Sequence, residues 1–190
     1  LHYPLRRQRQ MCIETEKQAW HGPNLRGSIR GLTAKQAAWR PSPKRHNIWE
    51  IVLHCAYWKY AVRRRILGEK RGSFPVKGSN WFVRPVTKTE KAWREDIRLL
   101  ESCHRSMREA IAHLNPSDLK RIPRGSKVSN TRIIFGIAAH DLYHTGQIQL
   151  LKRLMKRSRW LVVEIAQTTD GNELTRRIHT NHTGEDGRAC

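Results

Sequence analysis

The stretch AAHDLYHTGQIQLLKRL, residues 138–154, decides the fold, because it combines the apolar spacing of an amphipathic helix with two histidines four residues apart. Ser129, Asn130 or Thr131 can cap this helix, which we expect to end near Arg157. Its predicted inward row alternates spacings of four and three and contains Ile133, Ile137, His140, His144, Gln147, Leu151 and Leu154. Two imidazoles therefore occupy inward positions at which a buried helix face would ordinarily have leucine.

Three further segments have helical patterns. They are residues 13–30, 48–67 and 91–114. Glycines and a proline weaken the first segment, and Thr33 can cap a short turn after it. Capping-box spacing precedes the other two segments, with Asn47 and Glu50 before one and Thr87 and Glu90 before the other. These patterns predict four helices in all.

The predicted fold is an all-α four-helix bundle, because no strand pattern is longer than WLVVEI at residues 160–165. Residues 68–88 hold three glycines and two prolines and predict a long loop between helices two and three. The length of 190 residues suits one domain, which we place at residues 15–157. A basic N-terminal tail at residues 1–14 and a C-terminal tail at residues 158–190 flank it, and we expect the latter to be disordered from about Thr168.

The formal net charge is +21, from 37 Lys and Arg against 16 Asp and Glu, and it favours anionic partners. The basic residues form scattered clusters, and no helix-turn-helix, zinc knuckle or aromatic stacking platform accompanies them. Nucleic acid is therefore not expected as the partner, although a non-catalytic nucleic-acid binder stays open as the alternative. Four scattered cysteines, no apolar stretch of about 18 residues and no signal sequence favour a soluble cytoplasmic protein.

A third histidine has the same kind of position as the pair at residues 140 and 144. On the second predicted helix, an inward row contains Ile51, His54, Trp58 and Ala61. Three imidazoles that face one interior need several polar partners at once, and a divalent metal satisfies all three. Zinc and nickel accept neutral imidazole, and three protein ligands leave a position open for water or substrate. Spacing alone leaves satisfied core histidines as an equal alternative.

Neighbouring residues give further candidates. Gln147, one turn beyond His144, is the candidate catalytic residue, because its amide can bond substrate; a buried structural amide is the alternative. Glu50, four residues before His54, can orient that imidazole or act only as a helix cap. Asp141 is the weaker second-shell candidate, because adjacent helical residues diverge by about 100° and place it near the flank of the bundle.

These segments together resemble the DinB/YfiT-like family, named for DNA-damage-inducible proteins. The resemblance covers about residues 19–156 and is carried by four stretches: LTAKQAAWRPSPKRHNIWEIVLHCAYWKYAVRRRILGE, FPVKGSNWF, AWREDIRLLESCHRSMREAI and IIFGIAAHDLYHTGQIQLLKRL. Its most specific parts are the spacing from Trp49 to His54 and the series His140, His144 and Gln147. The stretch NLRGSIRG departs from the smoothly apolar first helix of the family and puts the packing there in doubt.

The resemblance implies a four-helix bundle, often a homodimer, in which His54, His140 and His144 bind a divalent metal. It also implies a metal-dependent enzyme that transfers a low-molecular-weight thiol to an electrophile or hydrolyses a small substrate. An anionic substrate or thiol would suit the basic surface.

Overall fold

The computed structural model describes residues 22–70, 72, 74–82 and 88–180, with side chains up to residue 158. This part of the chain is helical and contains no β-strand, as the sequence predicts for the fold class. The helices are α2 (Leu25–Ile29), α3 (Ala34–Ala37), α4 (Ile48–Ile66), α5 (Glu90–Ala112), α6 (Pro116–Lys120) and α7 (Asn130–Thr180).

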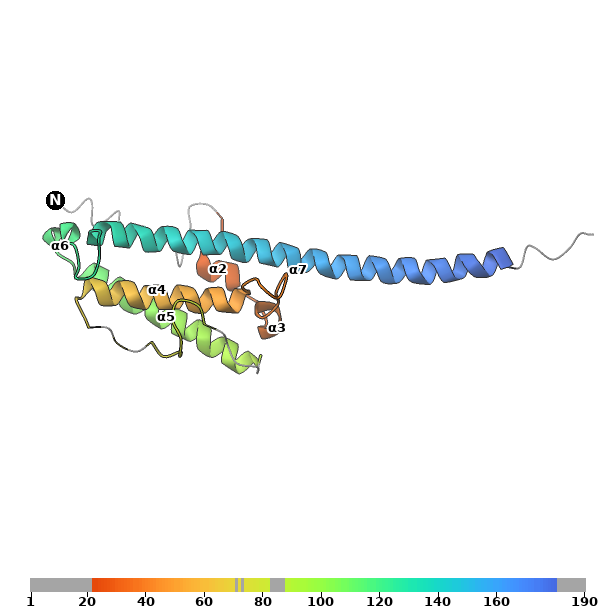
Figure 1. Cartoon of the computed structure of the whole chain (residues 1–190), viewed down its shortest axis with the longest axis horizontal. Helices are drawn as coiled ribbons and strands as arrows, with labels where there is room; N and C mark the ends of the chain where they lie inside the picture. Colours follow the sequence, from red (N-terminus) through yellow and green to blue (C-terminus); the bar gives the residue numbers. More distant parts are fainter. Residues whose placement is uncertain (1–21, 71, 73, 83–87, 181–190) are drawn as a thin grey trace, which may run out of the picture. The chain divides into compact units, whose positions relative to one another are not determined.

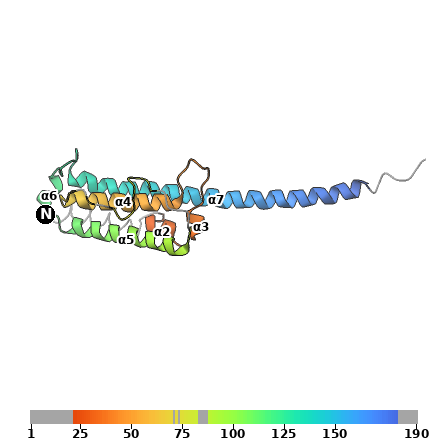
Figure 2. The same ribbon diagram turned by 60° about the horizontal axis from the view of Figure 1, so that its bottom comes forward.

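The chain divides into two compact units, Leu1–Leu151 and Lys152–Cys190, and every site described below lies in the first. In that unit α4, α5 and the beginning of α7 lie side by side, as Figures 1 and 2 both show. Two groups of buried apolar side chains hold them together. One group centres on Trp49, Leu53 and Trp93, and the other on Ile66, Met107 and Ile134.

The first predicted helix is far shorter than expected within the described residues. Only Leu25–Ile29 is helical, and its start is fixed by Asn24, whose side chain accepts a hydrogen bond from the backbone N–H of Gly27 at 2.7 Å. The N-terminal part of the prediction, and the basic tail before it, lie outside the described residues. The predicted cap at Thr33 is present and opens α3 with a complete capping box.

Helix α4 follows its sequence signals closely. The Asn47 side chain accepts from the N–H of Glu50, and the Glu50 carboxylate accepts from the N–H of Asn47, so both halves of the capping box form. The helix ends at Ile66, shortly before Gly68, which has a φ of +69°. That backbone conformation favours glycine and ends the helix where the sequence predicts.

The start of α5 differs from the prediction. Its cap is Thr89, whose hydroxyl accepts from the N–H of Ala92 at 3.2 Å, rather than Thr87, which lies outside the described residues. The Glu90 carboxylate instead accepts from the N–H of Ala34 at 2.7 Å and ties α5 to α3. The short helix α6 was not predicted.

Helix α7 continues to Thr180, so the prediction that the helix ends near Arg157 was wrong. The assignment of residues 158–190 to a tail outside the bundle stays a prediction. No proline follows Pro123 in the sequence, and residues 151–167 are rich in strong helix formers, so nothing in the chain stops the helix. No described helix is long and apolar enough to cross a membrane.

The buried face of α7 is rotated from the predicted row. Its buried side chains in the first unit include Ile134, Ile137, Ala138, Asp141, Thr145 and Ile148. Asp141 lies near the middle of this face, whereas His140, about 100° away around the helix, lies at its margin and is half-buried. The prediction that Asp141 lies near the flank was therefore wrong. His144 is buried at 4% exposure, whereas His140 lies at the margin of the buried face.

Candidate metal centre

Three histidines from two helices meet at one point. The Nε2 atom of His140 lies 3.0 Å from Nε2 of His54 and 3.2 Å from Nε2 of His144. One nitrogen from each of the three rings lies within 4.8 Å of the others. Helix α4 supplies His54, and successive turns of α7 supply the other two. The structure thus brings together the three residues that the sequence selected as metal ligands.

The opposite nitrogens of two of these rings are already engaged. Nδ1 of His54 lies 2.7 Å from the backbone carbonyl oxygen of Asn80, and Nδ1 of His144 lies 2.7 Å from Oε1 of Gln147. Since both partners are acceptors, each Nδ1 carries the proton and donates it, and each Nε2 presents a lone pair to the common point. A divalent cation would accept these converging lone pairs.

The distances suit a tetrahedral divalent ion. With metal–nitrogen bonds of about 2.0–2.1 Å, adjacent ligand nitrogens lie about 3.3–3.4 Å apart, close to the two separations above. Burial lowers the pKa of His54 to about 4 and also lowers that of His144, so both rings are neutral at physiological pH. Neutral imidazole is the form that binds metal. The three residues therefore form a site that can hold a divalent metal.

Aromatic rings wall the site. Trp81 stacks on His54 with ring centroids 3.9 Å apart, and His46 stacks on Trp81 at 3.7 Å. Trp58 lies edge-on to His54 at 6.3 Å, and its indole N–H donates to the side-chain oxygen of Asn80 at 2.9 Å. These rings shield His54 from water and restrict its rotation.

Asn80 contacts both His54 and one of these aromatic rings, Trp58. Its φ of +62° is uncommon outside glycine, but asparagine tolerates it better than most residues do. In this conformation its backbone carbonyl oxygen accepts from Nδ1 of His54, while its side-chain oxygen accepts from the indole N–H of Trp58. Asn80 was not among the residues predicted from the sequence.

Glu50 does not orient His54, contrary to the expectation that it acts as a second-shell partner. Its carboxylate forms an ion pair with Arg40 and lies 3.0 Å from Nδ1 of His46. Burial would raise the pKa of Glu50, but these partners outweigh burial and hold it below its usual value. The carbonyl oxygen of Asn80 already accepts from Nδ1 of His54, and Glu50 instead forms part of the capping box of α4.

Gln147 contacts the predicted ligand set, but not in the expected role. Its Oε1 accepts from His144 and its Nε2 donates to the Tyr143 hydroxyl at 2.9 Å. Both ends of the amide are therefore used within α7. The contacts make Gln147 a positioning residue for His144 rather than a catalytic one.

Asp141 and Lys59 form a buried ion pair between α7 and α4. Their exposed fractions are 2% and 1%. Burial would raise the pKa of Asp141, but the Lys59 ammonium outweighs burial and holds it below its usual value. The second carboxylate oxygen, Oδ1, lies 3.9 Å from Nδ1 of His140, and neither atom has a hydrogen-bond partner among the described residues. Asp141 thus lies beside Nδ1 of His140, the nitrogen that points away from the other two histidines.

A second group of possible ligands, Cys55 with His140 and Asp141, lies beside the first. Burial raises the pKa of the Cys55 thiol strongly, so the thiolate that binds metal is not available. Asp141 is also committed to Lys59. The three-histidine group is the better candidate.

A helical unit in which three histidines from two helices converge is an arrangement that helical metalloproteins use. The sequence model of the DinB superfamily matches residues 19–148, and the chain belongs to this family. No curated protein and no solved structure matches the chain in the comparisons.

Lys59 had a detectable sequence signal that was not used. It interrupts the apolar series Cys55, Val62 and Ile66 on α4 at helical spacing, and a charge in such a position needs a buried partner. Asn80 had a weaker signal, because Gly78, Ser79 and Asn80 are turn-forming residues but do not by themselves indicate which side chain they contact.

Proposed function

We propose that the protein is a metal-dependent enzyme in which His54, His140 and His144 bind zinc or nickel. The observation that carries the proposal is the convergence of the Nε2 atoms of these three histidines at one point. Bound there, the metal would supply an open position that activates a low-molecular-weight thiol for transfer to an electrophile, or water for hydrolysis of a small substrate.

The chain's own residues support this chemistry by positioning. Asn80 and Gln147 hold the outer nitrogens of His54 and His144, which fixes both rings in the metal-binding tautomer. Trp58 and Trp81 limit access of water from the α4 side. His140 is only half-buried, which leaves a route for substrate.

Metal analysis tests the first step. We expect the purified protein to contain about one zinc or nickel ion per chain, and the chelated protein to rebind one equivalent in calorimetry. Tight binding of less than about 0.2 equivalent would contradict the proposal. DNA binding that depends steeply on salt and survives chelation would instead favour the nucleic-acid alternative.

A thiol-transfer screen tests the reaction. We expect the metal-loaded protein, but not the chelated protein, to accelerate transfer of at least one common low-molecular-weight thiol to a chromogenic electrophile. If metal is present and transfer of no thiol is accelerated, hydrolysis of small esters and amides becomes the favoured reaction.

We further propose a homodimer through an exposed face of α7. The face contains Phe135, Ala139, Leu142, Gly146 and Leu150, all exposed and spaced by three or four residues. Leu142 and Leu150 are 55% and 57% exposed, and a row of apolar side chains on a helix surface is typical of an interaction site.

Light scattering tests the dimer. Leu142→Glu should convert a dimer to a monomer, because it places a charge in the centre of the apolar face. Leu67→Glu is the matched control, since Leu67 is 47% exposed but lies at the end of α4. A monomeric parent protein, or an unchanged dimer in the Leu142 variant, would exclude this interface.

A further inference from the structure

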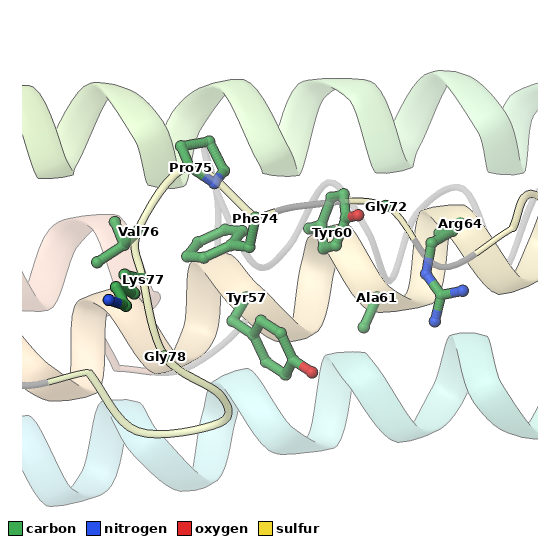
Figure 3. A pocket seen from close by; sticks show the side chains of 10 residues that line it. All are labelled: Tyr57, Tyr60, Ala61, Arg64, Gly72, Phe74, Pro75, Val76, Lys77 and Gly78. Atoms are coloured by element: carbon green, nitrogen blue, oxygen red, sulfur yellow. The ribbon is translucent and has the colours of Figure 1, made fainter.

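A cavity of about 400 Å³ lies between one face of α4 and the segment formed by residues 72 and 74–78 (Figure 3). We call it the α4 cavity. Tyr57, Tyr60 and Arg64 line it from successive turns of the helix, and Phe74 and Lys77 line it from the segment. Its size is that of a small-molecule site. None of the three metal-site histidines lines it.

The polar groups of the α4 cavity have unused hydrogen-bonding capacity. Nε of Arg64 is buried and has no hydrogen-bond partner in the described part of the chain. Among the described residues, the guanidinium makes one long contact, from Nη1 to the backbone carbonyl oxygen of Glu69 at 3.4 Å. A buried donor without an acceptor is unfavourable, and a ligand that brings an acceptor would relieve it.

The charge around Arg64 favours an anion. No carboxylate is among the described residues that line the α4 cavity, and Arg64 and Lys77 lie towards opposite ends of it in Figure 3. On its other side, Arg64 also lines a second cavity of about 510 Å³ together with Arg65, Lys70 and Arg124. The acid in that second cavity, Glu69, is paired with Arg63 at 2.8 Å.

The wall of the α4 cavity is aromatic. The Phe74 ring lies 5.6 Å from the rings of both Tyr57 and Tyr60, measured between centroids. Gly72 lets the chain pass close to Tyr60, because a Cβ there would lie 2.9 Å from the tyrosine hydroxyl. Flat apolar groups pack well against such rings.

From these features we propose that the α4 cavity binds a small aromatic carboxylate, with the ring against Tyr57 and Phe74 and the carboxylate on Arg64. The arginine fork matches a carboxylate in geometry as well as in charge. The same chain segment continues to Asn80 and Trp81, which contact His54. A ligand in the cavity therefore lies next to the segment that holds a metal ligand, although its binding does not require the metal.

Calorimetric titration of the full-length protein with 3-phenylpropanoate tests the proposal. The chelated protein is used, so that the carboxylate cannot bind to a metal ion instead. We expect saturable binding, and binding of the neutral amide, 3-phenylpropanamide, that is weaker by about tenfold or more. Because no metal is present, this result is independent of whether the proposed enzyme function is correct.

Variants locate the site. Arg64→Gln should weaken binding of 3-phenylpropanoate by about tenfold, because it removes the charged donor. Arg105→Gln removes the same charge from an exposed position on α5 and should leave binding unchanged. Circular dichroism checks that both variants fold. Absence of binding up to about 10 mM, equal binding of the amide, or equal effects of the two variants would each overturn the proposal.

Discussion

Lys59→Met is expected to lower the free energy of unfolding by about 3–5 kcal/mol, the usual cost of removing one partner from a buried ion pair. The substitution leaves the Asp141 carboxylate, which is 2% exposed, without its cation. The methionine side chain has a similar length, so lost packing contributes little. Urea unfolding of the chelated protein, monitored by circular dichroism, measures the change.

Two controls separate the charge effect from other causes. Lys91→Met removes an exposed lysine on α5 and should change stability by less than about 0.5 kcal/mol. The double variant with Lys59→Met and Asp141→Asn should recover part of the loss, because no charge then remains buried at the pair. A loss below about 1 kcal/mol for Lys59→Met would show that the ion pair is not buried as described.

His144→Ala should weaken zinc binding by more than about 100-fold, since loss of a direct ligand exceeds the 10–100-fold effect typical of outer partners. The contrast with Gln147→Leu makes the prediction sharper. That variant keeps all three candidate metal-binding nitrogens. It removes the acceptor for Nδ1 of His144 and the donor to the Tyr143 hydroxyl, so the expected loss is about 10–100-fold.

Competition with a chromophoric zinc chelator measures both affinities. His113→Ala is the matched control, because His113 is an exposed histidine at the end of α5 whose Nδ1 contacts only the carbonyl of Glu109. Its affinity should equal that of the parent. A His144→Ala variant that binds zinc within threefold of the parent would exclude the three-histidine site.

The sequence predicted well those features that depend on local chemistry. Capping at Asn47 and Glu50 follows from hydrogen bonds between residues three apart, and the start of α4 was therefore correct. The pairing of His140 with His144 follows from helical periodicity in the same way. To predict that His54 meets this pair, one must also expect both helices to face the same bundle interior. The family resemblance supported that expectation.

The remaining features depend on tertiary contacts that spacing does not reveal. The predicted row on α7 was centred on the histidines, and Asp141, about 100° from His140 around the helix, was therefore placed at its flank, whereas the buried face centres near Asp141. Lys59, 82 residues earlier in the chain, makes its burial possible. Likewise, spacing left two roles open for Glu50, a partner of His54 or a helix cap, because Arg40 and His46 in the preceding loop approach it from outside α4.

The stacking of Trp81 on His54 has a spectroscopic consequence. An indole whose ring centroid lies 3.9 Å from that of the imidazole is close enough for its emission to respond when the imidazole binds an ion. A paramagnetic ion such as nickel should quench that fluorescence, whereas zinc, with a filled d shell, should mainly shift it. The fluorescence of Trp81 should thus distinguish nickel from zinc at the proposed metal site.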